Sequence, residues 1–260
     1  MRKLNRIGLI AAFSALGALA LPAVEADAMT VQPVVIDLQT AGRGMTQVVT
    51  VQNTSTVPLP VELTVDQLAF GPEGMTVTGK DPGDLLVFPR EALIRPGRTQ
   101  AFRVQYVGDP ALASSKHYYM TVGQLPVEMP GANRGIQVLY NFQILVSVGP
   151  RGVKPDLKVV SAEVGRNEAG CPTPVITLRN DSAAYGYLSR GKLLIVARDA
   201  SGREVYRRTI PGPEIQQTIG YGLVTSGQTR RLVLPLTLPP ETLPTEGGAV
   251  EGRFTPDRRP

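Results

Sequence analysis

The segment that decides the fold is NRGIQVLYNFQILVSVGP, residues 133–150. Four apolar side chains occupy every second position of its first half: Ile136, Val138, Tyr140 and Phe142. Because successive side chains of a strand point to opposite faces, this alternation predicts a strand with one apolar face. The second half is almost continuously apolar, and the apolar run is about twice the usual strand length. Its stripe of apolar side chains must be covered, either by the domain's own core or by another chain.

Short segments with the composition of strands precede this one along the chain. They are rich in Val, Thr, Ile, Leu and aromatic residues, and are separated by turns that contain Gly, Pro, Asn or Asp. They are residues 29–39, 46–53, 59–70, 75–79, 85–94, 99–108 and 116–126. Such a series predicts an antiparallel β-sandwich of the immunoglobulin type, although the cysteines and tryptophan of antibody domains are missing.

The composition of the chain changes just after Pro150. The stretch GPRGVKPDL, residues 149–157, combines two Pro, two Gly and charges of both signs, as exposed hinges do. A second series of strand-like segments follows it. We therefore expect an all-β protein of two immunoglobulin-like β-sandwich domains, residues 29–150 and 151–240, joined by a short hinge and followed by a flexible tail over 241–260.

The first 28 residues resemble a secretory signal peptide. Arg2, Lys3 and Arg6 precede an apolar stretch that closes with Ala-Asp-Ala, the pattern that signal peptidase cleaves. We predict cleavage after Ala28 and export to the periplasm. A membrane anchor is the alternative, but the apolar stretch is short for a span of about 20 residues, so stable membrane insertion is not expected.

The composition argues against several classes of function. The chain has 27 basic and 22 acidic residues, and its basic clusters lack the interleaved aromatics of a nucleic-acid platform. With one cysteine, Cys171, and one histidine, His117, neither an intramolecular disulfide nor a conventional zinc site is expected. No spacing of carboxylates, nucleophiles or glycines indicates a catalytic or phosphate-binding motif. We expect no enzyme activity, no cofactor, no metal and no nucleic-acid partner.

Two motifs in the first half carry a family resemblance. FPREALIRPGRTQAFRVQY (88–106) and HYYMTVGQLPVEMP (117–130), followed by the long strand that ends in VGPR, resemble the periplasmic chaperones of the chaperone/usher pilus pathway. The resemblance implies that the chain binds pilus or fimbrial subunits and delivers them to an outer-membrane usher. It also implies that the apolar stripe is the strand lent to an unfinished subunit, with Ile136, Val138, Tyr140 and Phe142 as subunit-binding residues, and that the loop 126–135 is ordered on capture.

The sequence departs from the family pattern at the expected anchor for the subunit's carboxyl terminus. The resemblance places Val34 and Leu145, both apolar, where typical members carry Arg and Lys. Gly149 stands where an Arg that braces the two domains is expected, so such a brace is not evident. The chain is therefore most similar to the divergent, alternate branch of these chaperones. Possible substitutes for the anchor are Arg43, Arg90, Arg95, Arg98 and Lys116.

Two other interpretations remain open from the sequence. The stripe residues can be an ordinary internal strand that covers the core of its own domain. Alternatively, the chain is a secreted immunoglobulin-like structural pilin or adhesin subunit, whose stripe pairs with another copy and builds fibres. The second alternative predicts self-polymerisation.

Overall fold

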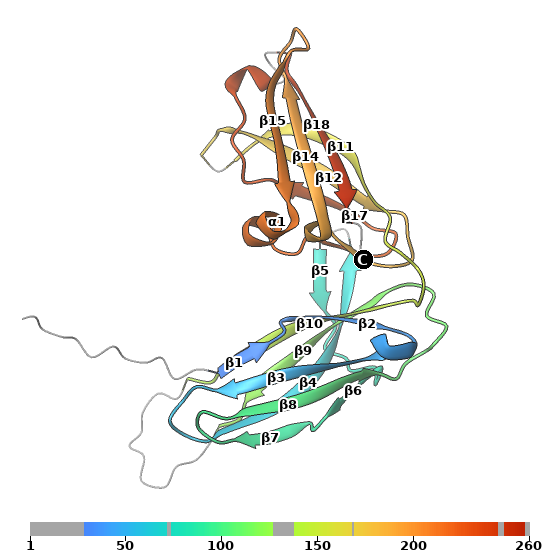
Figure 1. Cartoon of the computed structure of the whole chain (residues 1–260), viewed down its shortest axis with the longest axis vertical. Coiled ribbons are helices and arrows are strands. Elements are labelled where there is room, and N and C mark those ends of the chain that lie inside the picture. The colour runs from blue at the N-terminus through green and yellow to red at the C-terminus, as the bar shows by residue number, and fades with distance from the viewer. Residues whose placement is uncertain (1–28, 72–73, 127–137, 168, 244–246, 258–260) are drawn as a thin grey trace, which may run out of the picture.

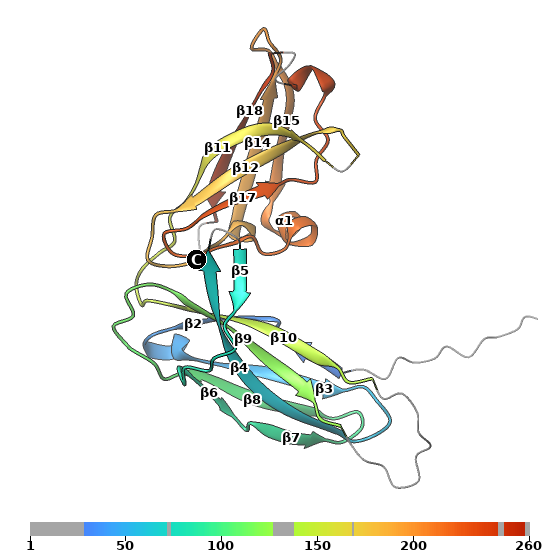
Figure 2. The same ribbon diagram turned by 180° about the vertical axis from the view of Figure 1, so that it is seen from behind.

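The computed structural model describes residues 29–71, 74–126, 138–167, 169–243 and 247–257, and shows two lobes built almost entirely of strands (Figure 1). The views from front and back agree that the lobes lie end to end and meet at an angle (Figures 1 and 2). One buried apolar cluster runs from Met29 to Val148, and another from Ile176 to Val250. Each lobe therefore has its own core. The signal-peptide prediction, and all but the first residue of the loop 126–135, fall outside the described residues.

The first domain is a sandwich of two sheets. One sheet has the order β1-β3-β8-β6, and the other β2-β10-β9-β4-β5 with β7 also paired to β4. The elements are β1 (Met29–Gln32), β2 (Val35–Gln39), η1 (Gly42–Met45), β3 (Thr46–Asn53), β4 (Leu59–Gly71), β5 (Gly74–Val77), β6 (Leu85–Phe88), β7 (Glu91–Ile94), β8 (Thr99–Tyr106), β9 (Lys116–Gln124) and β10 (Asn141–Gly149). All strand pairs are antiparallel except β2 with β10.

Two prolines split segments that the sequence predicted as single strands. Residues 29–39 divide at Pro33 into β1 and β2, and residues 85–94 divide at Pro89 into β6 and β7. Proline has no backbone N–H to donate to a ladder, so a strand is readily interrupted at this residue. In both cases the chain crosses from one sheet to the other, which brings β2 beside β10.

The second domain also consists mainly of two facing layers of strands. Their orders are β11-β12-β17 and β15-β14-β18, and a short β13-β16 pair lies beside them. The elements are β11 (Leu157–Arg166), β12 (Pro172–Asn180), β13 (Gly186–Tyr187), η2 (Leu188–Arg190), β14 (Gly191–Arg198), β15 (Glu204–Pro211), α1 (Gly212–Ile219), β16 (Leu223–Val224), β17 (Thr229–Val233), η3 (Pro240–Thr242) and β18 (Ala249–Pro256). The helix α1 was not expected; a proline in its first turn favours the start of a helix.

The predicted flexible tail over residues 241–260 is wrong for residues 249–256, which form β18. β18 pairs with β14 along all eight residues, from Gly191 opposite Pro256 to Arg198 opposite Ala249. Val250 is buried, and Phe254 packs against the core of the second domain. The sequence pattern does not reveal this strand, because its large apolar residues, Val250 and Phe254, are four positions apart and are separated by glycine and charged residues. The second domain therefore includes this segment.

The described residues contain no helix that is long and apolar enough to cross a membrane.

Candidate functional site

The two halves of β10 have different neighbours. β10 pairs with β9 from Asn141 to Val148, but β2 covers its other side only from Leu145 onward. Among the described residues, no strand pairs with the stretch 141–144 on the side away from β9. The first half of β10 is therefore an open sheet edge, and the second half is an internal strand.

The direction of the backbone groups at this edge follows from two hydrogen bonds. The Leu145 N–H donates to the Val34 carbonyl, 3.1 Å away, on the β2 side. The Tyr140 carbonyl accepts from the Gln124 N–H, 3.0 Å away, on the β9 side. Because these directions alternate along a strand, the N–H and C=O groups of Asn141 and Gln143 point to the open edge. They are free to pair with an added strand.

The burial of the side chains also changes along this segment. Ile144, Val146 and Val148 are fully buried in the core of the first domain, and Phe142 packs partly against it. Tyr140 and Val138 continue the same alternation beyond the end of the core, and are 37% and 60% exposed. The apolar face of β10 therefore extends past the part of the sandwich that covers it.

The predicted subunit-binding residues are thus placed differently from one another. Ile136 lies outside the described residues. Val138 and Tyr140 are exposed, whereas Phe142 is half-buried against its own domain. The alternative that these stripe residues cover the core of their own domain fits Phe142 in part and does not describe Val138 and Tyr140.

The two positions at which a basic anchor was expected lie side by side. The backbones of Val34 and Leu145 share the hydrogen bond described above, and Val34 is half exposed. Among the proposed substitutes, Lys116 is engaged by Asp84, with Nζ 2.8 Å from Oδ2, and Arg90 lies 3.6 Å from Asp81. Burial alone would raise the pKa of Asp84, but hydrogen bonds from Lys116 and Tyr118 outweigh it and hold the pKa below its ordinary value. Lys116 therefore serves the first domain itself.

The two domains enclose a cleft of about 1110 Å³. Its lining includes Asp37 and Gly149 from the first domain, Lys154 from the linker, and Tyr185 and Arg190 from the second domain. Asp37 accepts hydrogen bonds from Tyr185, 2.6 Å away, and from Arg190. The expectation that no Arg and acidic pair braces the domains is therefore wrong. No spacing in the sequence could have revealed this pair, since 153 positions separate its members.

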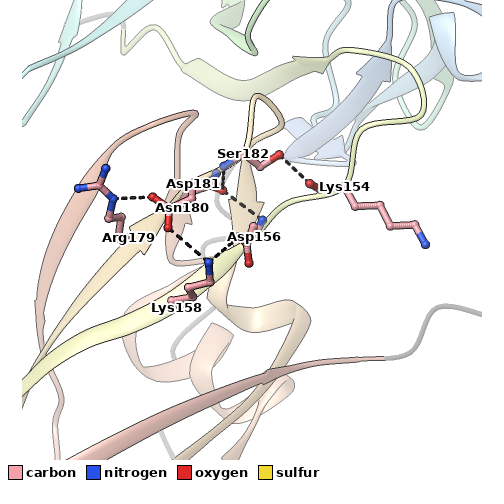
Figure 3. Close-up of polar contacts among 7 residues, drawn as sticks. All are labelled: Lys154, Asp156, Lys158, Arg179, Asn180, Asp181 and Ser182. Atoms are coloured by element: carbon pink, nitrogen blue, oxygen red, sulfur yellow. Dashed lines mark hydrogen bonds and ion pairs between the residues drawn. The ribbon is translucent and has the colours of Figure 1, made fainter.

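The linker is held to the second domain where it enters β11 (Figure 3). Lys158 contacts Asp156 at 2.8 Å and Asp181 at 3.4 Å, and Arg179 contacts the other oxygen of Asp181 at 2.5 Å. The buried Asn180 beside them accepts a hydrogen bond from the Asp156 N–H at 3.2 Å. Its amide group donates to the carbonyls of Ala184, Val224 and Thr225. This asparagine fixes the linker relative to the loops that face the cleft.

No family model and no curated protein matches the sequence. Among solved structures, the class 5 fimbriae chaperone CfaA matches with a TM-score of 0.50 and 13% identity, over 87% of this chain and 99% of that one. A chaperone–tip adhesin complex of CFA/I fimbriae biogenesis matches with a TM-score of 0.49, 13% identity, and coverage of 88% and 100%. The CsuC–CsuE complex of Acinetobacter baumannii Csu pili gives 0.48, 14%, and 81% and 89%.

The match to CfaA covers 87% of this chain and confirms the predicted all-β fold of two sandwich domains. The resemblance found in the sequence is therefore confirmed at the level of the fold. The open edge of β10 lies within that fold, at the end of the first domain that points away from the second (Figure 1).

Proposed function

We propose that this chain is a periplasmic chaperone that binds pilus or fimbrial subunits by donor-strand complementation and delivers them to an outer-membrane usher. The observation that carries the proposal is the open edge of β10, where unpaired backbone groups at Asn141 and Gln143 adjoin the exposed side chains of Val138 and Tyr140. A binding strand needs both features, backbone groups for the ladder and apolar side chains for the pockets.

The chemistry of the partner follows from this edge. A subunit that lacks its last strand exposes a row of unpaired backbone groups beside an apolar groove, which makes it prone to aggregate. β10 would supply the missing hydrogen bonds, while Val138 and Tyr140, with Ile136 before them, would enter the groove. Each such side chain contributes roughly 1.5 to 3 kcal/mol on full burial. Phe142 would contribute less, since its own domain already covers part of it.

The internal half of β10 gives the donor its rigidity. Leu145–Val148 is paired on both sides, so the strand direction and register are fixed before a subunit arrives. Ordering a free residue costs about 1 to 2 kcal/mol. A preformed strand avoids much of this cost, which supports donation from β10 in preference to a flexible segment.

Delivery to an usher needs a second surface, and the outer face of the β1-β3-β8-β6 sheet supports one. Val48, Arg103 and Phe88 lie opposite one another in a row across three strands. Val48 and Phe88 are 52% and 70% exposed, and Leu86 beside them is 53% exposed. Large exposed apolar side chains gathered around a basic one, as here around Arg103, favour a protein interaction site. It lies on a different sheet from β10, so both surfaces are accessible at once.

The proposal is tested by co-expression with a pilin-type subunit. Wild-type chain should co-purify with the subunit and keep it soluble, whereas Val138→Asp and Tyr140→Asp should fold but lose capture, because a charge in an apolar groove costs several kcal/mol. The matched control is Gln143→Glu, an exposed side chain on the other face of the same strand. Capture by the two Asp variants at the wild-type level would refute donation by this strand. Fibres formed by the chain alone would favour the structural pilin.

A further inference from the structure

His117, the only histidine of the sequence, lies where the two domains meet. It belongs to β9, and its side chain points to the outer face of the sheet, toward the second domain. It is 3% exposed. Phe70 from β4 and Tyr185 from the second domain contact the imidazole edge to face, with ring centroids 5.1 and 5.4 Å away. The ring is therefore closed in by aromatic groups of both domains.

Only one imidazole nitrogen of His117 has a polar partner among the described residues. Nδ1 lies 2.9 Å from the Ser147 hydroxyl, and that hydroxyl also accepts a hydrogen bond of 3.2 Å from the Tyr187 hydroxyl of the second domain. Nε2 is buried without a hydrogen-bond partner. A neutral imidazole can leave this nitrogen bare, but a protonated one carries a second N–H and a positive charge that this site cannot satisfy.

The charged and titratable groups around His117 come from several elements. β2 contributes Asp37, which is already bonded to Tyr185 and Arg190. The η2 segment contributes Arg190, whose guanidinium also lies 4.9 Å from the Tyr187 ring centroid. The residues that β4 and β10 place against the imidazole, Phe70 and Ser147, carry no charge. Among the residues that the structure describes, the carboxylate that favours the charged imidazole is Asp37, and this carboxylate is already paired with Arg190.

We propose that this junction is a proton-sensitive latch: protonation of His117 separates Tyr185 and Tyr187 from the first domain and frees the angle between the domains. In the closed state, with Tyr185 and Tyr187 packed on the first domain, the buried site disfavours the charged imidazolium. In the open state, with these tyrosines separated from it, water hydrates the imidazolium. One proton is therefore taken up for each molecule that opens. This inference concerns the joint between the domains and stands independently of the proposed function.

The direction of the pH dependence follows by linkage. Burial lowers the pKa of His117 to about 4 in the closed state, although Asp37 acts in the opposite direction, and exposure in the open state restores the ordinary value of 6.5. Between these two pKa values the open state binds more protons than the closed state. The stability of the closed state relative to the open state is therefore greatest above pH 6.5 and decreases as pH falls toward 4. The ratio of open to closed molecules should rise on the order of a hundredfold across this interval.

The titration of His117 can be measured directly, because the single histidine of the untagged chain gives a single pair of imidazole C–H signals in a proton–carbon NMR spectrum. We expect a midpoint well below 6 in the wild type. Tyr185→Ala removes the second-domain ring that covers the imidazole, so its midpoint should move toward 6.5. Tyr140→Ala, which removes an exposed tyrosine far from the junction, should leave the wild-type midpoint unchanged. Midpoints near 6.5 in all three proteins would overturn the proposal.

Opening itself is measured by small-angle X-ray scattering of the full chain at pH 7.5 and pH 4.5. The wild type should become more extended at the lower pH. His117→Phe keeps an aromatic ring but cannot take up a proton, and His117→Gln keeps a polar group without charge, so neither should extend. Equal extension of the variants and the wild type would assign the effect to other groups, and unchanged scattering of the wild type would disprove the latch.

Discussion

The two halves of β10 share one sequence pattern and differ in what covers them. Ile144, Val146 and Val148 are buried between the two sheets of their own domain. Val138 and Tyr140, just before β10, follow the same alternation, but their side chains are exposed. The backbone pairing also changes along this strand, since β2 pairs with β10 only from Leu145 onward. An alternating apolar pattern thus specifies which face needs cover, while the neighbouring strands decide whether that cover is internal.

The same contrast applies to the backbone of β10. On the β9 side the ladder continues past the strand to Tyr140, and on the other side it stops near Val34. Neighbouring residues in the open half therefore use their hydrogen-bonding groups for different purposes. One set holds the first domain together, and the other is available to a partner.

The largest effect should come from exchanging adjacent residues of the open half for proline. The Phe142 N–H points toward β9, so Phe142→Pro should destabilise the first domain by about 3 kcal/mol or more. The Asn141 N–H points to the open edge, and Asn141→Pro should change stability by no more than about 1 kcal/mol. Urea denaturation measures both, with Phe142→Ala as the reference for the lost ring. Equal destabilisation by the two prolines would show that the edge is not open.

Truncation of a buried side chain of β10 should be nearly as costly. Ile144 is fully buried, and Ile144→Ala should lower the free energy of unfolding by about 2 to 5 kcal/mol through lost apolar contact and the cavity left behind. The matching truncation in the open half, Val138→Ala, should lie within about 0.5 kcal/mol of the wild type. A large loss from Val138→Ala would mean that this side chain is covered by its own domain.

A smaller effect is expected on affinity for a subunit. Val138→Ala and Tyr140→Ala should each weaken binding about tenfold to a hundredfold, corresponding to roughly 1.5 to 3 kcal/mol of lost burial. Asn141→Pro should weaken it by about tenfold through one missing backbone hydrogen bond. Titration calorimetry with the subunit that co-purifies with the wild-type chain measures these constants. Wild-type affinity in all three variants would place the binding strand elsewhere.

Much of the fold was predictable because its cause is local. The alternation in 99–108 and 116–126 predicts β8 and β9, and the Gly- and Pro-rich stretch after Pro150 predicts the break between the two series of strands. The division of 85–94 at Pro89 was missed, although proline is a known interruption of a ladder. β18 was missed because apolar residues that recur only every fourth position do not reveal a strand that is half exposed.

The features of the site that sequence reasoning could not supply are all long-range. The parallel pairing of β2 with β10 determines where the open edge begins, and no local pattern encodes it. Asp37 and Arg190 come from different domains, and their pairing becomes visible only when β2 and η2 meet at the cleft. The alternating residues 136–142 identified the stripe, but only the fold distinguishes the covered Phe142 from the exposed Tyr140.

The central claim is tested most directly by amide hydrogen exchange along β10, resolved by residue, with and without bound subunit. In the free chain, the amides of Phe142 and Ile144 should be protected by β9, while those of Asn141 and Gln143 exchange rapidly. In the complex, Asn141 and Gln143 should become protected as the subunit's groove pairs with the open edge. Protection of Asn141 and Gln143 already in the free chain, or rapid exchange of both in the complex, would contradict donation of this strand.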